Sequence, residues 1–259
     1  MKSGTASWYE KLWWYDLSGA SLDYLRWYEK TFLKEDIEWD LKKVLNIGCS
    51  RNIFLKELKD KGCDVTAVDI NKDIVKFTKN VLGIDKSFVS DVYKLGINEE
   101  KSKFDIIIIF QVLEHLEAPG EVFRLLKGFL AYDAKLFLSI PNRDRIYPQK
   151  SVWDYPPHHL TRWDKKSIRM FFETHSYRVD KIITAPLLCD DVYYLFNFGF
   201  GTRTLERKIR AGSKNIFFPL IYYSLCKLRV AFYKLLAAIG RIFIKEGQDL
   251  YVVVNCRKD

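Results

Sequence analysis

The sequence predicts an α/β fold with a mostly parallel β-sheet, and three features indicate this. Residues 44–70 have the pattern of a buried strand, a small-residue turn, a helix and a second strand in that order, which is a βαβ unit. Residues 104–110 (FDIIIIF) show no polar alternation, as expected for a central parallel strand covered on both faces. With 259 residues, 48% of them hydrophobic, the chain can bury the core of one such domain with an elaboration.

The segment before this unit, residues 1–40, is expected to form an N-terminal helical cap. Large apolar side chains recur there at helical spacings: Trp8, Leu12, Tyr15, Leu22, Leu25 and Tyr28, followed by Phe32. The simplest interpretation is a pair of helices that packs on the edge of the domain. The segment has no continuous apolar core and no cleavage site, so we expect no secretory signal.

The βαβ unit has the features of a nucleotide-binding site. Its first strand (Val44, Leu45, Ile47) runs into a turn at Gly48, and its second strand ends on Asp69, 21 residues after that glycine. Such a turn lets the backbone approach a ligand, and the following helix offers free N–H groups. An acid at the end of the second strand can accept hydrogen bonds from ribose hydroxyls.

The remaining elements follow from local signals. Asn71 can cap a helix that runs to about residue 82, Pro119 can open a helix that runs to about residue 130, and Asp164 can cap a third. Strands are expected at residues 87–90, 136–140, 177–184 and 250–255.

The order of these motifs resembles the class I S-adenosylmethionine-dependent methyltransferases, particularly the small-molecule branch that includes the ubiquinone-biosynthesis O-methyltransferases. Their first motif usually reads acid-x-Gly-x-Gly-x-Gly, and the matching positions here are Asn46, Gly48, Ser50 and Asn52. Residues 111–115 (QVLEH) resemble the family's fourth motif, Glu-Val-Leu-Glu-His. The resemblance implies a Rossmann-like, seven-stranded, mostly parallel sheet with an antiparallel last strand.

The resemblance also implies S-adenosylmethionine as the cofactor. It places Asp69 on the ribose hydroxyls and Asp91, at the end of the third strand, on the adenine amino group, although a turn aspartate is the alternative there. The cofactor-binding residues that it implies are Asn46, Gly48, Ser50, Asp69, Ile70, Asp91, Val92 and Gln111. N-terminal helices of this family often cover the cofactor or substrate, which is a second interpretation of residues 1–40.

Residues 141–163 have no regular period and hold four of the seven prolines, and a stretch of that kind inside a compact domain is usually functional. Its Pro-His-His-Leu segment looks like the substrate loop of this branch. Methyl transfer to a hydroxyl needs a base, most simply a histidine, so the catalytic candidates are His159, His158 and His115. If the loop is extended, His158 and His159 point to opposite sides, and the family's His-Leu pair favours His159. A structural histidine is the alternative for each.

Some relatives bind a divalent ion with a Glu-x-x-Glu-His cluster. Here Glu114 and His115 are present, but Gln111 replaces the first glutamate, and magnesium depends on such anionic oxygens. The five cysteines are scattered and form no CxxC pair, which is typical of reduced thiols in the cytoplasm. We therefore expect no metal ion.

An insertion is expected at residues 186–247, and one segment within it has a net charge equal to that of the whole chain. Residues 203–245 hold ten Lys/Arg and one acid, so their net charge of +9 equals that of the whole chain. Apolar residues keep helical spacing there, while Lys227, Lys234 and Arg241 recur every seven residues. No uncharged run is long enough to span a bilayer. A basic amphipathic helix of this kind favours an anionic membrane surface or an amphiphilic partner, and a cap or homodimer helix is the alternative.

These features predict an N-terminal cap (1–40), a methyltransferase core (41–185 and 248–259) and a helical insertion (186–247). The predicted function is O-methylation of a small or lipid-linked acceptor, of quinone or glycan type, by a cytoplasmic protein at the inner face of a membrane. A degenerate, non-catalytic binding protein is the first alternative. An RNA methyltransferase is the second, but nucleic acid is not expected, because the basic residues are interleaved with bulky apolar ones.

Overall fold

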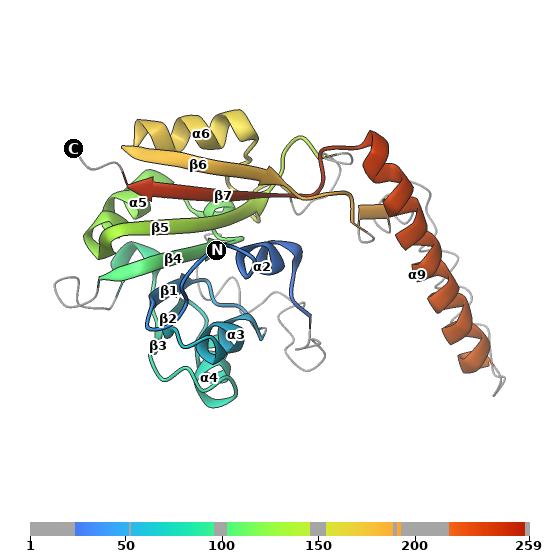
Figure 1. The fold of residues 1–259 in the computed structure, drawn as a ribbon, viewed down its shortest axis with the longest axis horizontal. Coiled ribbons are helices and arrows are strands. Elements are labelled where there is room, and N and C mark those ends of the chain that lie inside the picture. Colours follow the sequence, from blue (N-terminus) through green and yellow to red (C-terminus); the bar gives the residue numbers. More distant parts are fainter. Residues whose placement is uncertain are drawn as a thin grey trace. The chain divides into compact units, whose positions relative to one another are not determined.

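A computed structural model describes residues 24–51, 53–95, 103–145, 154–188, 191–192 and 218–256 (Figure 1). Contacts divide the chain into two compact units, one comprising residues 1–143, 150–183 and 250–259, and the other residues 144–149 and 184–249. Most of the expected N-terminal cap, including Trp8, Leu12, Tyr15 and Leu22, lies outside the described residues.

The described residues form one seven-stranded sheet, as predicted, in the order β3-β2-β1-β4-β5-β7-β6. Its strands are β1 (Lys43–Ile47), β2 (Asp64–Asp69), β3 (Ser87–Val89), β4 (Phe104–Phe110), β5 (Leu130–Pro141), β6 (Tyr177–Thr184) and β7 (Asp249–Cys256). β1 pairs in parallel with β2 and β4, β2 with β3, and β4 with β5. β7 runs opposite to β6 in Figure 1, which confirms the antiparallel last strand.

Helices cover both faces of the sheet. They are α2 (Trp27–Phe32), α3 (Phe54–Asp60), α4 (Lys72–Asn80), α5 (Pro119–Leu126) and α6 (Lys165–Thr174), with short 3-10 turns η2 (Val92–Lys94), η3 (Leu113–His115) and η4 (Lys127–Phe129). Along β4, Ile107 and Ile109 pack in the core with α5 and α6, whereas Ile106 and Ile108 pack in the core with α2, α3 and α4. Burial on both faces explains why this strand is apolar from Ile106 to Phe110.

Local signals set the helix ends. Asn71 caps α4 through bonds that its side chain accepts from the N–H groups of Asp73 and Ile74, and Asp164 caps α6 by accepting from Ser167 N–H at 2.6 Å. Both caps were predicted from sequence. α5 begins at Pro119 as expected but ends at Leu126, because η4 and an early start of β5 at Leu130 occupy the residues that were expected to continue it.

The described part of the N-terminal segment packs on the sheet. Phe32 is fully buried, and its ring centroid lies 4.7 Å from that of Phe137 and 5.7 Å from that of Phe54. Tyr28 packs against Phe110 in the same cluster. α2 is therefore part of the core. Cys49, Cys63 and Cys256 are free thiols.

The second unit contains the long helix α9 (Phe218–Phe243). Tyr233 and Ala237 on this helix are buried against Leu187 and Val192 of the same unit. Within the part of the chain that the structure describes, no helix is both long and apolar enough to cross a membrane.

Candidate active site

The candidate site lies at the carboxyl-terminal edge of the central strands. β1 lies between β2 and β4 in the sheet. The chain therefore builds β2 and β3 on one side of β1 and then crosses over to build β4 on the other side. Ligands of open parallel sheets bind at the carboxyl ends of the strands where the connections diverge in this way.

The turn after β1 is held tightly. Gly48 has a φ of +75°, and its N–H donates to Val68 O at 2.8 Å. A Cβ at this position would lie 2.4 Å from Cγ2 of Val112, so only glycine fits. Ser50 has a φ of +53°, a left-handed conformation that costs energy for a residue with a side chain. The chain therefore keeps the glycine-type turn at Ser50, where the family usually has a second glycine.

Asp69 is buried at the end of β2 and ties the turn to the sheet. One carboxylate oxygen accepts from Asn71 N–H at 2.9 Å, and the other accepts from Ser50 N–H at 3.3 Å. Burial raises the pKa of Asp69, and these N–H donors oppose that rise. Oδ2 also accepts from Cys49 Sγ at 3.9 Å, so the second lone pair of Oδ1 can accept one further donor, such as a ribose hydroxyl.

The other residues implied as cofactor contacts line the same edge. Asn46 is buried at the end of β1, and among the described residues no donor reaches its Oδ1. Such an acceptor needs a partner, which a ligand can supply. Gln111 follows β4 with a φ of +56°, and its Nε2 donates to Ser139 Oγ at 3.0 Å. Two left-handed residues at the ends of neighbouring strands, Ser50 and Gln111, are typical of ligand sites. The acceptors and the turn fit a nucleoside cofactor.

At the edge of β3, Asp91 is exposed, and its Oδ1 accepts from Tyr93 N–H at 3.0 Å, which caps η2. Val92, next to it, packs against the core, and Ile70 directly follows Asp69. Asp91 thus has a turn role already, and its role toward adenine stays a prediction. Asn52 lies outside the described residues.

A second part of the site is built from the proline-rich loop. The N–H groups of Leu160 and Thr161 both donate to Glu114 O, at 2.8 and 3.1 Å, and so fasten the loop to η3. The N–H groups of His158 and His159 both point to Tyr155 O, at 3.0 and 3.3 Å. The backbone here is a turn. The expectation of an extended segment with opposed histidines was therefore wrong, because this turn brings both rings to one side.

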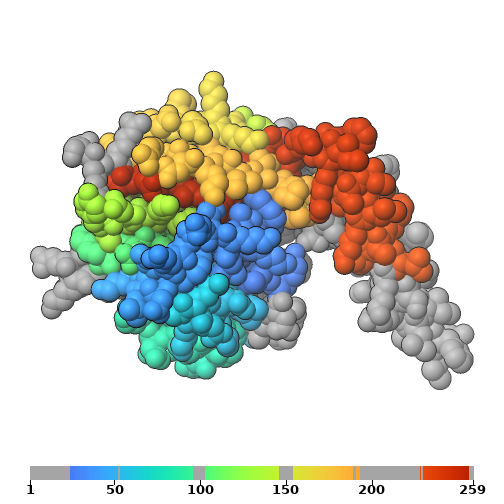
Figure 2. Space-filling model, in the orientation of Figure 1, coloured from blue at the N-terminus to red at the C-terminus, as the bar shows by residue number. Residues whose placement is uncertain are grey.

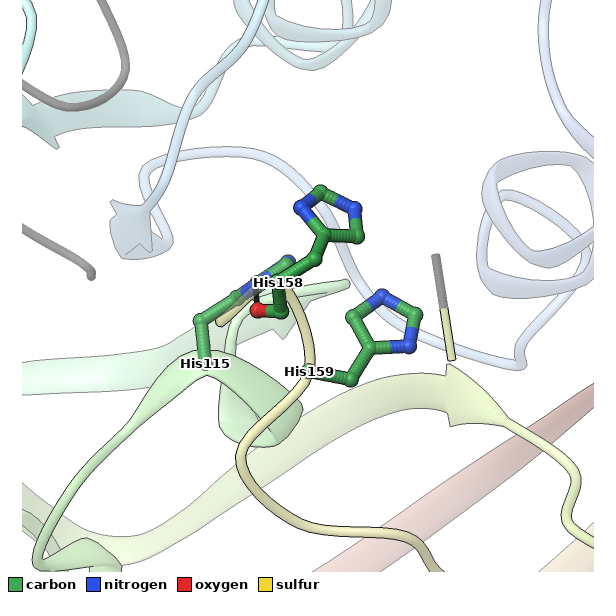
Figure 3. A group of neighbouring side chains, drawn as sticks. All are labelled: His115, His158 and His159. Atoms are coloured by element: carbon green, nitrogen blue, oxygen red, sulfur yellow. Dashed lines mark hydrogen bonds between the residues drawn. The ribbon is translucent and has the colours of Figure 1, made fainter. Parts of the chain in front are cut away.

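The turn places His158 and His159 beside His115, and Figure 3 shows the three rings gathered together. Ring centroids are 5.0 Å apart for His115 and each of the other two, and 4.6 Å apart for His158 and His159. His115 Nδ1 donates to His158 O at 2.8 Å, which leaves its Nε2 as the acceptor nitrogen. Burial lowers the pKa of His115 to about 3 and that of His158 to about 4.

A buried carboxylate accompanies the third ring. Asp154 Oδ1 lies 3.5 Å from Nδ1 of His159, and Asp154 itself is buried. Asp154 was not among the predicted site residues. A signal was present, since Asp154 is one of two acids of the same proline-rich loop and lies five positions before His159, but spacing in an irregular loop does not predict contact.

The arrangement supports two kinds of chemistry. One is proton transfer, with His159 and Asp154 as a base and its orienting acid. The other is metal binding, because one ring nitrogen from each histidine lies within 4.8 Å of the others. Nitrogen ligands of this kind suit zinc and related transition ions more than magnesium. The expectation that the site uses no metal stays a prediction.

Strand order, the glycine turn and the acid after β2 define a Rossmann-like methyltransferase of the class whose cofactor is S-adenosylmethionine. The chain belongs to the methyltransferase domain family, whose sequence model matches residues 20–182.

Among curated relatives, the ubiquinone biosynthesis O-methyltransferase of Glaesserella parasuis is 34% identical over 109 residues, which are 39% of this chain and 46% of that protein. The match thus spans about half the length of the relative.

Two solved structures share the fold. A putative methyltransferase of Haloferax volcanii, in complex with the Trm112 methyltransferase activator, has a TM-score of 0.59 at 14% identity and 90% coverage of both chains. Coclaurine N-methyltransferase, bound to N-methylheliamine and SAH, has a TM-score of 0.55 at 13% identity, with 88% of this chain and 70% of that one covered.

Proposed function

We propose that this chain transfers a methyl group from S-adenosylmethionine to a hydroxyl group of a small or lipid-linked acceptor, with His159 as the base. The observation on which the proposal depends is the pair of His159 and buried Asp154 within the histidine cluster, beside the end of β4. Family membership supports methyl transfer, and the similarity to a ubiquinone biosynthesis O-methyltransferase supports a hydroxyl acceptor of quinone type.

His159 is better suited to this role than the other two histidines. The carboxylate of Asp154 favours the tautomer with a proton on Nδ1 of His159, so that Nε2 is the acceptor nitrogen. It also stabilises the imidazolium that forms. His115 and His158, whose pKa values are lowered to about 3 and about 4, are weak bases near neutral pH. We therefore assign them to packing and positioning.

The reaction requires one proton transfer and one displacement. The acceptor hydroxyl gives its proton to Nε2 of His159 as its oxygen forms a bond to the methyl carbon. When bound, S-adenosylmethionine would supply an activated methyl group on sulfur, and the sulfur would keep the electron pair of the carbon–sulfur bond. His159 then releases the proton to solvent. The protein's main contribution is to hold the acceptor oxygen in line with that bond.

A non-catalytic binding protein is the alternative, and the departures at Asn46, Ser50 and Asn52 favour it. Titration calorimetry with S-adenosylmethionine separates the two, since measurable binding supports the enzyme and its absence supports the alternative.

The base is tested with the variants His159→Ala and His158→Ala, using a farnesylated dihydroxybenzoate as the acceptor. Loss of a general base typically lowers the rate by about 10²–10⁴-fold. His159→Ala should show such a loss in kcat with little change in cofactor affinity, and Asp154→Asn should show a smaller one. His158→Ala, the matched control on the neighbouring ring, should lose much less. The opposite order would assign the base to His158, and near-wild-type rates in both would remove the role from the loop.

A further inference from the structure

Helix α9 has two apolar faces, and among the described residues of the second unit one of them is buried. The inner face contains Tyr233 and Ala237, which are buried against Leu187 and Val192. A Cβ on Gly240 would lie 2.6 Å from Leu187 Cδ2, so the helix approaches this partner closely along that face.

The opposite face is also apolar but is exposed. It is formed by residues spaced alternately four and three positions apart: Leu228, Phe232, Leu235, Ile239 and Ile242. The exposed fraction of each of these residues lies between 48% and 68%. At 100° per residue they lie roughly opposite the inner face. α9 is coloured orange to red in Figure 2, and its described residues lie at the molecular surface there. A continuous stripe of large apolar side chains on a surface marks an interaction site.

The charge beside this stripe limits what can cover it. Lys234 and Arg241 are exposed at positions of α9 between the two apolar faces, and Lys245 is exposed just beyond the end of the helix. α9 contains no Asp or Glu, and residues 207–245 contain none either. A second copy packed on the stripe would place like charges together, whereas paired helices place opposite charges beside such a seam. A partner that is complementary to the stripe and its basic flanks is therefore anionic at its surface and apolar inside.

We infer that α9 lies in the plane of an anionic lipid surface, with the exposed stripe inserted among the acyl chains and the basic residues at the headgroups. The helix is about 39 Å long at 1.5 Å per residue, and its mix of apolar and basic residues is that of an interfacial helix. Lipid binding of this kind does not require methyl transfer. It would bring an amphiphilic acceptor of the proposed reaction to the protein.

The test is co-sedimentation of the full chain with vesicles of phosphatidylcholine alone and with vesicles that also contain phosphatidylglycerol. We expect binding to the anionic vesicles only, weakened by added salt because the Debye length shortens from about 10 Å at 0.1 M to about 3 Å at 1 M. Leu235→Gln/Ile239→Gln, which leaves net charge unchanged, should reduce this binding at least about tenfold. Both side chains are exposed, so the variant should fold.

A second pair of variants isolates the charge. Lys227→Glu/Lys234→Glu on α9 should also reduce anionic-vesicle binding at least about tenfold, because each basic residue near the surface contributes to the attraction. Lys76→Glu/Lys79→Glu changes net charge by the same amount on exposed positions of α4 and should bind as wild type.

Equal loss in the α4 control, binding to neutral vesicles alone, or no vesicle binding would overturn the inference. So would a dimer in light scattering that Leu235→Gln/Ile239→Gln dissociates, since a second copy would then cover the stripe. Affinity for S-adenosylmethionine, measured on the same variants, should not change. Failure of lipid binding is thus distinguishable from failure of the proposed reaction.

Discussion

Replacing Asp69 by alanine is the sharpest test of the cofactor site. The carboxylate accepts from the N–H groups of Asn71 and Ser50 and from Cys49 Sγ, and its Oδ1 can accept one ribose hydroxyl. Hydrogen bonds to a charged group contribute about 1.5–3 kcal/mol each. Because about 1.4 kcal/mol is a factor of ten in affinity, loss of even one ribose contact should weaken S-adenosylmethionine binding at least about tenfold.

The same substitution affects folding. Two backbone N–H groups lose their acceptor, which destabilises the fold by about 1–3 kcal/mol for a donor that stays buried. Removal of a buried carboxylate has the opposite effect, because the desolvation penalty of that charge disappears. We therefore expect a net loss of about 1–3 kcal/mol in the free energy of unfolding. Asp69→Asn keeps one oxygen acceptor and should be the more stable of the two variants.

Calorimetric titration of the folded variants with S-adenosylmethionine gives the answer, with thermal melts to establish folding. Asp64→Ala is the matched control, because it removes an aspartate at the opposite end of the same strand, where the carboxylate pairs with Lys86 on the surface. It should bind the cofactor as wild type does. Wild-type affinity in folded Asp69→Ala or Asp69→Asn would refute the assignment.

Three further outcomes are expected. Gly48→Ala should lower the free energy of unfolding by about 1–3 kcal/mol, because the new Cβ would meet Val112 Cγ2 at 2.4 Å; adding Val112→Ala should recover part of that loss in a denaturant titration. The folded-state pKa of His115, about 3, lies below its unfolded value of about 6.5, so stability should be constant above about pH 6.5 and fall toward pH 3. At pH 5 the free energy of unfolding should be lower by up to about 2 kcal/mol. His115→Gln should reduce this dependence on pH, as measured by thermal melts at a series of pH values. Chelators should leave methyl transfer unchanged and added Zn²⁺ should inhibit it, because the ion would occupy Nε2 of His159; loss of turnover with EDTA that Zn²⁺ restores would contradict the base assignment.

Local sequence determined much of the core. The isoleucines of β4 predicted a strand buried on both faces, and each of them packs as expected. Asn71 and Asp164 predicted the starts of α4 and α6, because a capping side chain acts on N–H groups only two or three residues away. The turn at Gly48 was likewise readable, since its left-handed backbone excludes most other residues.

Tertiary structure alone decided the geometry of the histidine cluster and which face of α9 is buried. The sequence named three histidines, but their gathering depends on Tyr155 O and Glu114 O, backbone acceptors that any residue type could supply. Asp154 gained its place beside His159 by the same loop folding. Helical spacing cannot say which of two apolar stripes is buried. The face of α9 that contains Tyr233 is buried because it contacts Leu187 and Val192. These residues are remote in the chain, so the helical pattern does not reveal them.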